Sequence, residues 1–338
     1  MVGMQSSTTG SGPDHGVPAP APSFPPLRLG TWPTPLEPAP RLAEALGLRG
    51  DDLWIKRDDL TGLAGGGNKI RKLEWTVAGA LAEGADTLVT TGAAQSNHAR
   101  LTAAVGARLG LDVVLVLAGE APAAPSGNLL LDGLLGARLV WAGDADAESL
   151  DARARETAAE LRRAGANPAV IPFGGSSVLG ARGYLEAGRE ILQQSPEVRH
   201  IVVALGSGGT MAGLVAAAGA RRVLGVDTGA RPGVRTVVGT YAAALTEDPP
   251  SAEDLRVRTD QVGAGYATLT SETAEALSLA ARCEGVVLDP VYTGRALAGL
   301  RAAVRDGEIR PGETTVLMHT GGLPGFFGHP DVAAAVFG

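Results

Sequence analysis

The segment Ile201-Val-Val-Ala-Leu-Gly-Ser-Gly-Gly-Thr-Met-Ala-Gly213 decides the fold class of this chain. It runs from a short β-branched stretch through a glycine-rich turn into an Ala/Gly/Leu-rich stretch, which is the order strand, turn, helix. Glycines let the backbone approach an anion closely, and the first N–H groups of a helix have no partners within it. The segment therefore predicts a phosphate-binding loop. Its residues are Gly206, Ser207, Gly208, Gly209 and Thr210.

A dinucleotide-binding loop is the alternative interpretation of the same segment. Asp227 ends the next predicted strand, near the ~20-residue offset at which an acidic residue binds a ribose in such folds. However, Met211 stands where the third glycine of that pattern belongs. A Walker-type loop is excluded, because the chain contains no Gly-Lys-Ser or Gly-Lys-Thr. Nicotinamide binding stays open as the minority interpretation.

Similar β-branched runs alternate with longer Ala/Leu/Arg/Glu segments along most of the chain. This alternation is typical of βαβ units and predicts an α/β fold, with mostly parallel twisted sheets flanked by helices. Ligands in such folds bind beyond the carboxyl ends of strands, which indicates the loops after Val89, Leu205 and Met318. The predicted strands cover residues 53–55, 87–89, 113–116, 139–141, 169–171, 201–203, 223–226 and 315–318. Predicted helices include residues 41–48, 70–81, 271–283 and 293–304.

Length and composition limit the class of protein. A chain of 338 residues is long enough for two lobes. Its net charge of −7 provides no basic stripe for nucleic acid, and no apolar run approaches the ~18 residues of a membrane span. A single cysteine, Cys283, excludes an internal disulfide and indicates a reducing compartment, so we expect the cytoplasm. Residues 1–25 have almost no large apolar side chains and no signal-peptide pattern, and we expect a disordered tail.

A lysine stands where a second glycine-rich loop enters a predicted helix, in Gly65-Gly-Gly-Asn-Lys-Ile-Arg-Lys-Leu-Glu74. The partial positive charge of a helix start disfavours a protonated amine there, which suggests that Lys69 serves as a neutral amine. A lysine that forms a Schiff base must be unprotonated for part of its cycle. On this segment alone, an exposed basic cluster of Lys69, Arg71 and Lys72 is the more common arrangement.

A third polar turn, Gln95-Ser-Asn-His98, lies between a predicted strand and a helix. Its side chains and the unpaired helix N–H groups could bind an anion such as a substrate carboxylate. An ordinary N-cap by Ser96 or Asn97 is the alternative.

The remaining candidates are individually weak. Cys283 lies on a predicted apolar helix and is expected to be a small core residue. No pair of histidines has the spacing of a metal site, so no metal is expected. Tyr266 and Tyr292 occur in loops of a chain with few aromatic residues, and either could transfer protons.

Six motifs in one order carry a family resemblance. They are Lys56-Arg-Asp-Asp-Leu-Thr-Gly-Leu-Ala64, Gly67-Asn-Lys69, Gln95-Ser-Asn-His98, Gly206-Ser-Gly-Gly-Thr210, Asp289-Pro-Val-Tyr-Thr-Gly294 and His319-Thr-Gly-Gly-Leu-Pro-Gly325. Together they resemble the D-cysteine desulfhydrase and 1-aminocyclopropane-1-carboxylate (ACC) deaminase family of fold-type II pyridoxal-phosphate (PLP) enzymes, the tryptophan-synthase-β-like group. The resemblance runs from about Pro26 almost to the C-terminus and outweighs the surface interpretation of Lys69.

The resemblance implies a role for each matching residue. Lys69 would carry PLP as a Schiff base, Asn97 would contact the cofactor's ring hydroxyl, and the loop from Gly206 to Thr210 would hold its phosphate. Ser96 and the two tyrosines, Tyr266 and Tyr292, would act in catalysis. The residues implied to bind the substrate are Ser96, Asn97, His98, Tyr266, Tyr292 and Thr320. The residues implied to bind the cofactor, apart from the phosphate loop, are Lys69, Asn97, Thr293 and Thr320.

The resemblance also implies an architecture. A large PLP-binding domain would comprise residues 26–72 and 183–338, and a small domain residues 73–182, in a homodimer that acts on a small amino acid. From the residues alone, Gly174-Gly175-Ser176-Ser177 and Gly180 are the best candidates for a hinge between the domains.

Two positions bear on the substrate. The deaminases carry glutamate and leucine where this chain has Thr293 and Thr320, which are similar to the desulfhydrases. A neutral hydroxyl near the pyridine nitrogen favours its protonation less than a carboxylate would, and elimination of a good leaving group tolerates the weaker electron sink. We therefore expect α,β-elimination of D-cysteine to pyruvate, hydrogen sulfide and ammonia.

Several alternatives stay open. Ala93-Ala94 and Arg295 depart from the usual desulfhydrase residues Gly-Val and Lys. ACC deamination and elimination from L-cysteate or D-serine use the same chemistry. A binding protein that retains the fold without catalysis belongs to a different class, although the presence of Lys69 and Ser96 together disfavours it.

Overall fold

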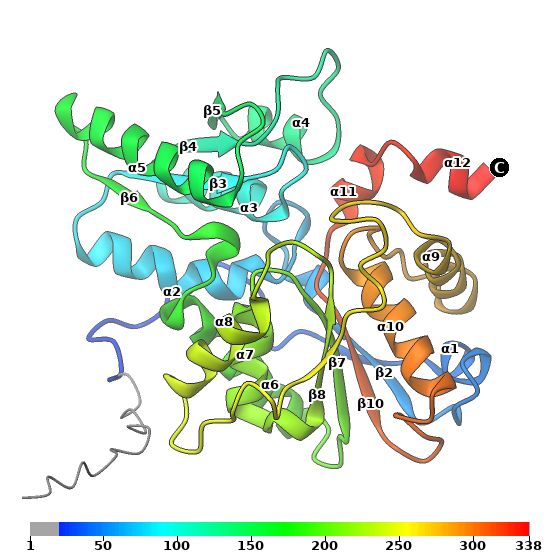
Figure 1. The fold of residues 1–338 in the computed structure, drawn as a ribbon. Helices are drawn as coiled ribbons and strands as arrows, with labels where there is room; N and C mark the ends of the chain where they lie inside the picture. Colours follow the sequence, from blue (N-terminus) through cyan, green and yellow to red (C-terminus); the bar gives the residue numbers. More distant parts are fainter. Residues whose placement is uncertain (1–19, 338) are drawn as a thin grey trace, which may run out of the picture.

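The computed structural model describes residues 20–337, and these form two sheets with helices packed on them (Figure 1). The first sheet has six strands in the order β1-β2-β10-β7-β8-β9, and the second has four in the order β5-β4-β3-β6. Every strand pair is parallel except the antiparallel pair β1 and β2. The strands are β1 (Leu36–Pro38), β2 (Leu53–Arg57), β3 (Thr87–Gly92), β4 (Asp112–Leu117), β5 (Arg138–Trp141), β6 (Pro168–Val170), β7 (His200–Leu205), β8 (Val223–Asp227), β9 (Arg256–Arg258) and β10 (Thr315–His319).

Helices cover both faces of the six-stranded sheet because its central strands are apolar on both sides. In β7, Val202 and Ala204 face one core while Ile201, Val203 and Leu205 face the other. The first core also contains residues of α1 (Pro40–Ala45), α9 (Ser271–Glu284) and α10 (Thr293–Arg305). The second contains residues of α6 (Val178–Gln194), α7 (Gly209–Ala218) and α8 (Val234–Ala243). Continuous apolar strands of this kind are what a buried parallel sheet requires.

The four-stranded sheet is covered in the same way. One face packs against α2 (Lys69–Ala82), α3 (Asn97–Leu109) and α4 (Gly127–Leu134), and the other against α5 (Ala147–Arg163). Two short helices, α11 (Leu323–Gly328) and α12 (Val332–Phe337), end the described chain. Short 3₁₀ helices η1 (Asp58–Leu60), η2 (Leu63–Gly65), η3 (Phe173–Gly175) and η4 (Ala220–Arg222) complete the order.

The predicted α/β class is confirmed, and each predicted strand and helix lies on an observed element. Strands β1 and β9 were not predicted, since each has three residues and sits at a sheet edge. The predicted domain boundaries and hinge stay predictions. The predicted tail, residues 1–25, lies outside the described residues apart from residues 20–25. Within the described chain no helix is long and apolar enough to cross a membrane.

Candidate active site

A cavity of about 290 Å³ lies at the carboxyl ends of β3, β7 and β10, where the parallel topology predicts a ligand site. Its volume is close to the lower end of the range for small-molecule sites, ~300–1,000 Å³. The cavity brings together most of the predicted site residues: Lys69, Ser96, Asn97, His98, Gly206, Ser207, Gly208, Thr210, Tyr266, Tyr292 and Thr320. Gly209 and Thr293 do not line it.

Lys69 is the first residue of α2 and presents its amine to the cavity. The Nζ atom lies 3.6 Å from the position that a Cβ atom on Gly174 would occupy. Burial lowers the pKa of the Lys69 amine from 10.5 to about 8. A much larger share of this amine is therefore neutral near pH 7 than in an exposed lysine, as nucleophilic attack on an aldehyde requires.

The predicted phosphate loop joins β7 to α7 and points the start of that helix at the cavity. Gly208, with a φ of 94°, adopts a backbone conformation that other residues rarely take. Ser176, which follows η3, supports the loop from behind. Its Oγ atom accepts from the backbone N–H of Gly209 at 3.3 Å and lies 2.7 Å from Ser207 Oγ. The backbone N–H groups at the start of α7 and the hydroxyls of Ser207 and Thr210 can together bind an anion.

Lys72 is a functional candidate that the sequence analysis missed. Its side chain is completely buried, and its Nζ atom donates to Ser176 Oγ at 3.0 Å and to the carbonyl of Gly174 at 3.3 Å. No carboxylate in residues 20–337 forms an ion pair with it. Burial first, and then the Lys69 amine, hold the pKa of Lys72 well below 10.5.

A buried amine without a counter-charge beside an anion cradle is suited to pairing with a phosphate. Ser176 accepts from both Lys72 and Gly209, so its own proton is directed to Ser207, whose hydroxyl can then donate into the cavity. The interpretation of Lys72 and Arg71 as exposed residues is wrong, since Arg71 is also buried. The spacing of three between Lys69 and Lys72, which places both on one helix face, was the available signal.

Ser96 caps α3, as the N-cap interpretation of this turn expects, and it also lines the cavity, where its contact with a substrate carboxylate stays a prediction. Its Oγ atom accepts from the backbone N–H of Ala99 at 3.1 Å, which leaves its proton free to donate. Asn97 follows as the first helical residue and also lines the cavity.

His98 is buried as a neutral imidazole whose tautomer follows from its neighbour. Thr90 Oγ1 donates its single proton to the carbonyl of Ile171 at 2.8 Å, so it must accept from His98 Nε2, 2.9 Å away. His98 Nδ1 is then an unpartnered acceptor. Burial, followed by Lys69 and Lys72, holds the pKa of His98 well below 6.5. Because Nδ1 is an acceptor, the imidazole cannot donate to a substrate carboxylate. The predicted contact of His98 with the substrate could therefore be made only by its backbone N–H.

The two predicted tyrosines form a pair at the cavity. Their hydroxyl oxygens are 2.6 Å apart, and their rings meet edge to face with centroids 6.2 Å apart. Although Tyr266 is 37% exposed, desolvation of its hydroxyl raises the pKa of Tyr266, and desolvation together with the interaction with Tyr266 raises the pKa of Tyr292 well above 10. Both phenols are therefore neutral at pH 7. Since one hydroxyl donates to the other, one proton remains to be donated into the cavity.

Arg295 and Asp289 hold the loops that carry these tyrosines. The buried guanidinium of Arg295 donates to the carbonyls of Thr228, Gly265 and Thr268 at 2.6–2.8 Å, which fixes the chain on either side of Tyr266. The Thr293 hydroxyl donates to Asp289 Oδ1 at 2.6 Å, away from the cavity lining. Its predicted contact with the cofactor stays a prediction.

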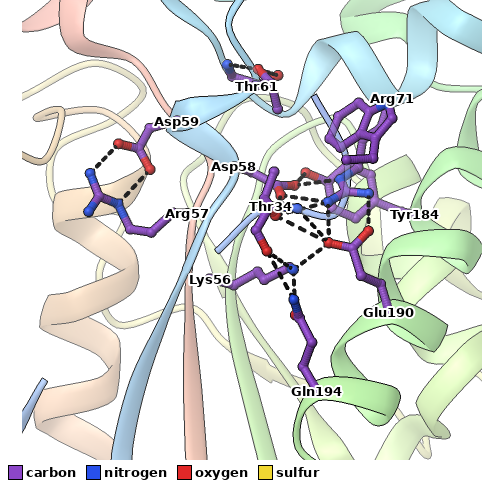
Figure 2. A network of polar contacts seen from close by, with 12 residues as sticks. Thr34, Lys56, Arg57, Asp58, Asp59, Thr61, Arg71, Tyr184, Glu190 and Gln194 are labelled. Atoms are coloured by element: carbon purple, nitrogen blue, oxygen red, sulfur yellow. Dashed lines mark hydrogen bonds and ion pairs between the residues drawn. The ribbon is translucent and has the colours of Figure 1, made fainter. Parts of the chain in front are cut away.

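A buried polar network, drawn in Figure 2, anchors α2 through residues that do not line the cavity. Asp58 accepts from Arg71 Nε and Nη2, both at 2.9 Å, from the Thr34 hydroxyl at 2.8 Å and from the Tyr184 hydroxyl. Glu190 of α6 pairs with Arg71 and with the fully buried Lys56. The network joins β2, η1, α2 and α6, and so fixes the helix that begins with Lys69.

Comparisons with known proteins give this site a family. A family model described as pyridoxal-phosphate dependent enzyme matches residues 27–321. A Pyrococcus horikoshii protein provisionally named a 1-aminocyclopropane-1-carboxylate deaminase is 41% identical over 322 residues, which cover 91% of this chain and 95% of that protein. A D-cysteine desulfhydrase of Salmonella typhi is 41% identical over 336 residues, 91% of this chain and 98% of its own.

A solved structure agrees with these sequence matches. The crystal structure of an ACC deaminase homologue superposes with a TM-score of 0.83 at 38% identity, over 93% of this chain and 97% of that one. The predicted resemblance and the fold-type II architecture are confirmed, and PLP is the cofactor. The chain belongs to the family of pyridoxal-phosphate-dependent enzymes.

Proposed function

We propose that this PLP-dependent lyase converts D-cysteine and water to pyruvate, hydrogen sulfide and ammonia. The relatives named desulfhydrase and deaminase support elimination or deamination of a small amino acid. The observation that carries the finer proposal is that Thr320, a residue with a neutral hydroxyl, lines the cavity. By the family resemblance, the deaminases have leucine at this position. The backbone carbonyl of Thr320 accepts from the N–H of Asn68 at 3.0 Å, which fixes this loop beside Lys69.

The cavity residues fit the cofactor. Lys69 is an amine for its aldehyde, and Ser207 and Thr210, with the start of α7, provide donors for its phosphate. Lys72 does not line the cavity, but its amine contacts Ser176, the residue that supports this loop. When bound, PLP supplies an electron sink for negative charge that develops at the substrate α-carbon.

The residues of this chain would then perform the proton transfers. The Lys69 amine, with its lowered pKa, accepts the α-proton. The tyrosine pair, with its raised pKa values, donates a proton to the departing sulfur. The free hydroxyl proton of Ser96 and the backbone N–H groups at the start of α3 bind the substrate carboxylate.

A substrate panel tests the proposal. Purified protein with PLP would be incubated separately with D-cysteine, ACC, D-serine and L-cysteate, and keto acid, sulfide and ammonia would be quantified. We expect pyruvate and sulfide in equal amounts from D-cysteine, and none from a Lys69→Ala control. Turnover of ACC with no sulfide from D-cysteine would favour deamination, the second candidate, which the name of the Pyrococcus horikoshii relative and the ACC deaminase homologue structure support.

We also propose that the protein is a cytoplasmic homodimer with no nucleic-acid partner. Helices α4 and α11 pack against each other, and together they expose four large apolar side chains, which supports a contact between two copies of the chain. These are Leu130, Leu134, Leu323 and Phe327. Light scattering would give the mass of the assembly, and Leu134→Asp together with Phe327→Asp should yield a monomer. A dimeric double variant would refute this interface.

A further inference from the structure

Asn97 lines the cavity, and what it can do there depends on the orientation of its side-chain amide. Its side-chain amide carries one acceptor and two donor hydrogens, and only the donor end can stabilise negative charge on a ligand oxygen. Asn97 lines the cavity, whereas Asn128 of α4 is completely buried behind it. Asn128 Nδ2 lies 3.1 Å from Asn97 Oδ1.

The orientation of Asn128 follows from two neighbours that each have a single hydrogen-bonding role. Arg100 has only donors, and its Nε atom lies 2.8 Å from Asn128 Oδ1, which must accept. The backbone carbonyl of Gln95 has only acceptors, and it lies 3.0 Å from Asn128 Nδ2, which must donate. The second hydrogen of the same amide group is thereby directed to Asn97 Oδ1.

Arg100 itself is held by the loop that precedes Lys69. Its guanidinium donates to the carbonyls of Ala64 and Gly66, the latter at 3.1 Å. Gln95 is fixed independently, since its Oε1 atom accepts from the backbone N–H of Asn128 at 2.9 Å and its Nε2 atom donates to the Ser126 carbonyl at 3.0 Å. Every amide in the chain of contacts therefore has one permitted orientation.

We propose that Asn128, oriented by Arg100, is a positioning residue that fixes the Asn97 amide with its NH₂ group facing the cavity. The inference rests on the proposed function and on the contact between Asn97 and the ring oxygen of PLP that the family resemblance implies. Neither Asn128 nor Arg100 lines the cavity, so both act through Asn97. A donor at the ring oxygen stabilises its negative charge and lowers the pH at which the visible absorption of the lysine-bound cofactor titrates.

Asn128→Asp tests this polarity. The substitution keeps an acceptor for Arg100, but the carboxylate has no hydrogen to give to Asn97 Oδ1. Asn97 should turn over and present its oxygen to the cavity. We expect the midpoint of the absorbance titration to rise by about one pH unit, which is tenfold in the proton equilibrium. Asp132→Asn, one helical turn further along α4, changes a buried carboxyl near Arg100 without contacting Asn97 and should leave the midpoint unchanged.

A double-mutant cycle with Asn97→Ala separates positioning from a direct effect of the new charge. If Asn128 acts through Asn97, Asn128→Asp shifts the midpoint in the wild-type background and has no effect once Asn97 is alanine. An equal shift in both backgrounds, or no shift in either, overturns the inference. The wild type serves as the check on the proposed function, because a wild-type protein without visible absorption at saturating PLP would refute the cofactor assignment instead.

Discussion

The lowered pKa of Lys69 makes a prediction that can be tested in the apoprotein. Burial places this pKa at about 8, against 10.5 for an ordinary lysine. At pH 7 about 9% of the Lys69 amine is then neutral, compared with about 0.03% of an exposed lysine, a difference of roughly 300-fold. The reactivity of Lys69 should rise tenfold per pH unit below pH 8 and level off above it.

The chain is well suited to this measurement because it contains only three lysines, Lys56, Lys69 and Lys72. The apoprotein would be pulsed with a neutral acylating reagent between pH 6 and 11, and labelled peptides would be quantified by mass spectrometry. An unstructured peptide that contains one lysine provides the reference for the reactivity of an exposed lysine. Lys72→Met should leave the midpoint near 8, because burial alone lowers the pKa of Lys69.

A Lys69 midpoint near 10.5, or one that returns to 10.5 in Lys72→Met, would refute this reasoning. The first result would mean that water reaches the amine freely. The second would mean that the charge of Lys72, and not burial, sets the pKa of Lys69.

Three further predictions follow from the contacts described above. Asp58→Ala leaves Arg71 buried without its carboxylate and should lower the free energy of unfolding in urea by about 3–5 kcal/mol. The control Glu275→Ala removes an exposed ion pair with Arg301 and should lower it by at most about 1 kcal/mol. Equal losses would contradict the structural role of the network. Lys72→Met should weaken PLP binding to the apoprotein about 10- to 100-fold in a fluorescence titration, and an unchanged affinity would remove Lys72 from the phosphate site. Thr320→Val should lower kcat/KM for D-cysteine by about tenfold and leave PLP affinity unchanged; the opposite pattern would place its hydroxyl elsewhere.

The sequence predicted the parts of the site that one segment determines by itself. The glycine loop at 206–210 sits at the junction of β7 and α7 because a β-branched run and a helical run flank it. Ser96 caps α3 for a similarly local reason. These features depend on spacing and backbone preferences, which a single stretch of sequence contains.

Features that depend on contacts between distant segments were not predictable in this way. Asn128 contacts Asn97 across 31 positions of sequence, and nothing near Asn128 indicates a polar role. The burial of Lys72 follows from η3 and Ser176, about a hundred residues further on. The same residue types are exposed in most proteins, so only the fold distinguishes these from solvated side chains.

The proposed site and its chemistry depend on a covalent bond between the Lys69 amine and PLP. The holoprotein would be reduced with borohydride and digested, and the peptides analysed by mass spectrometry. We expect the mass of reduced pyridoxal phosphate on the peptide containing Lys69, with loss of the visible absorption, and no modification in Lys69→Ala. Attachment to Lys56 or Lys72, or no attachment at saturating PLP, would contradict it.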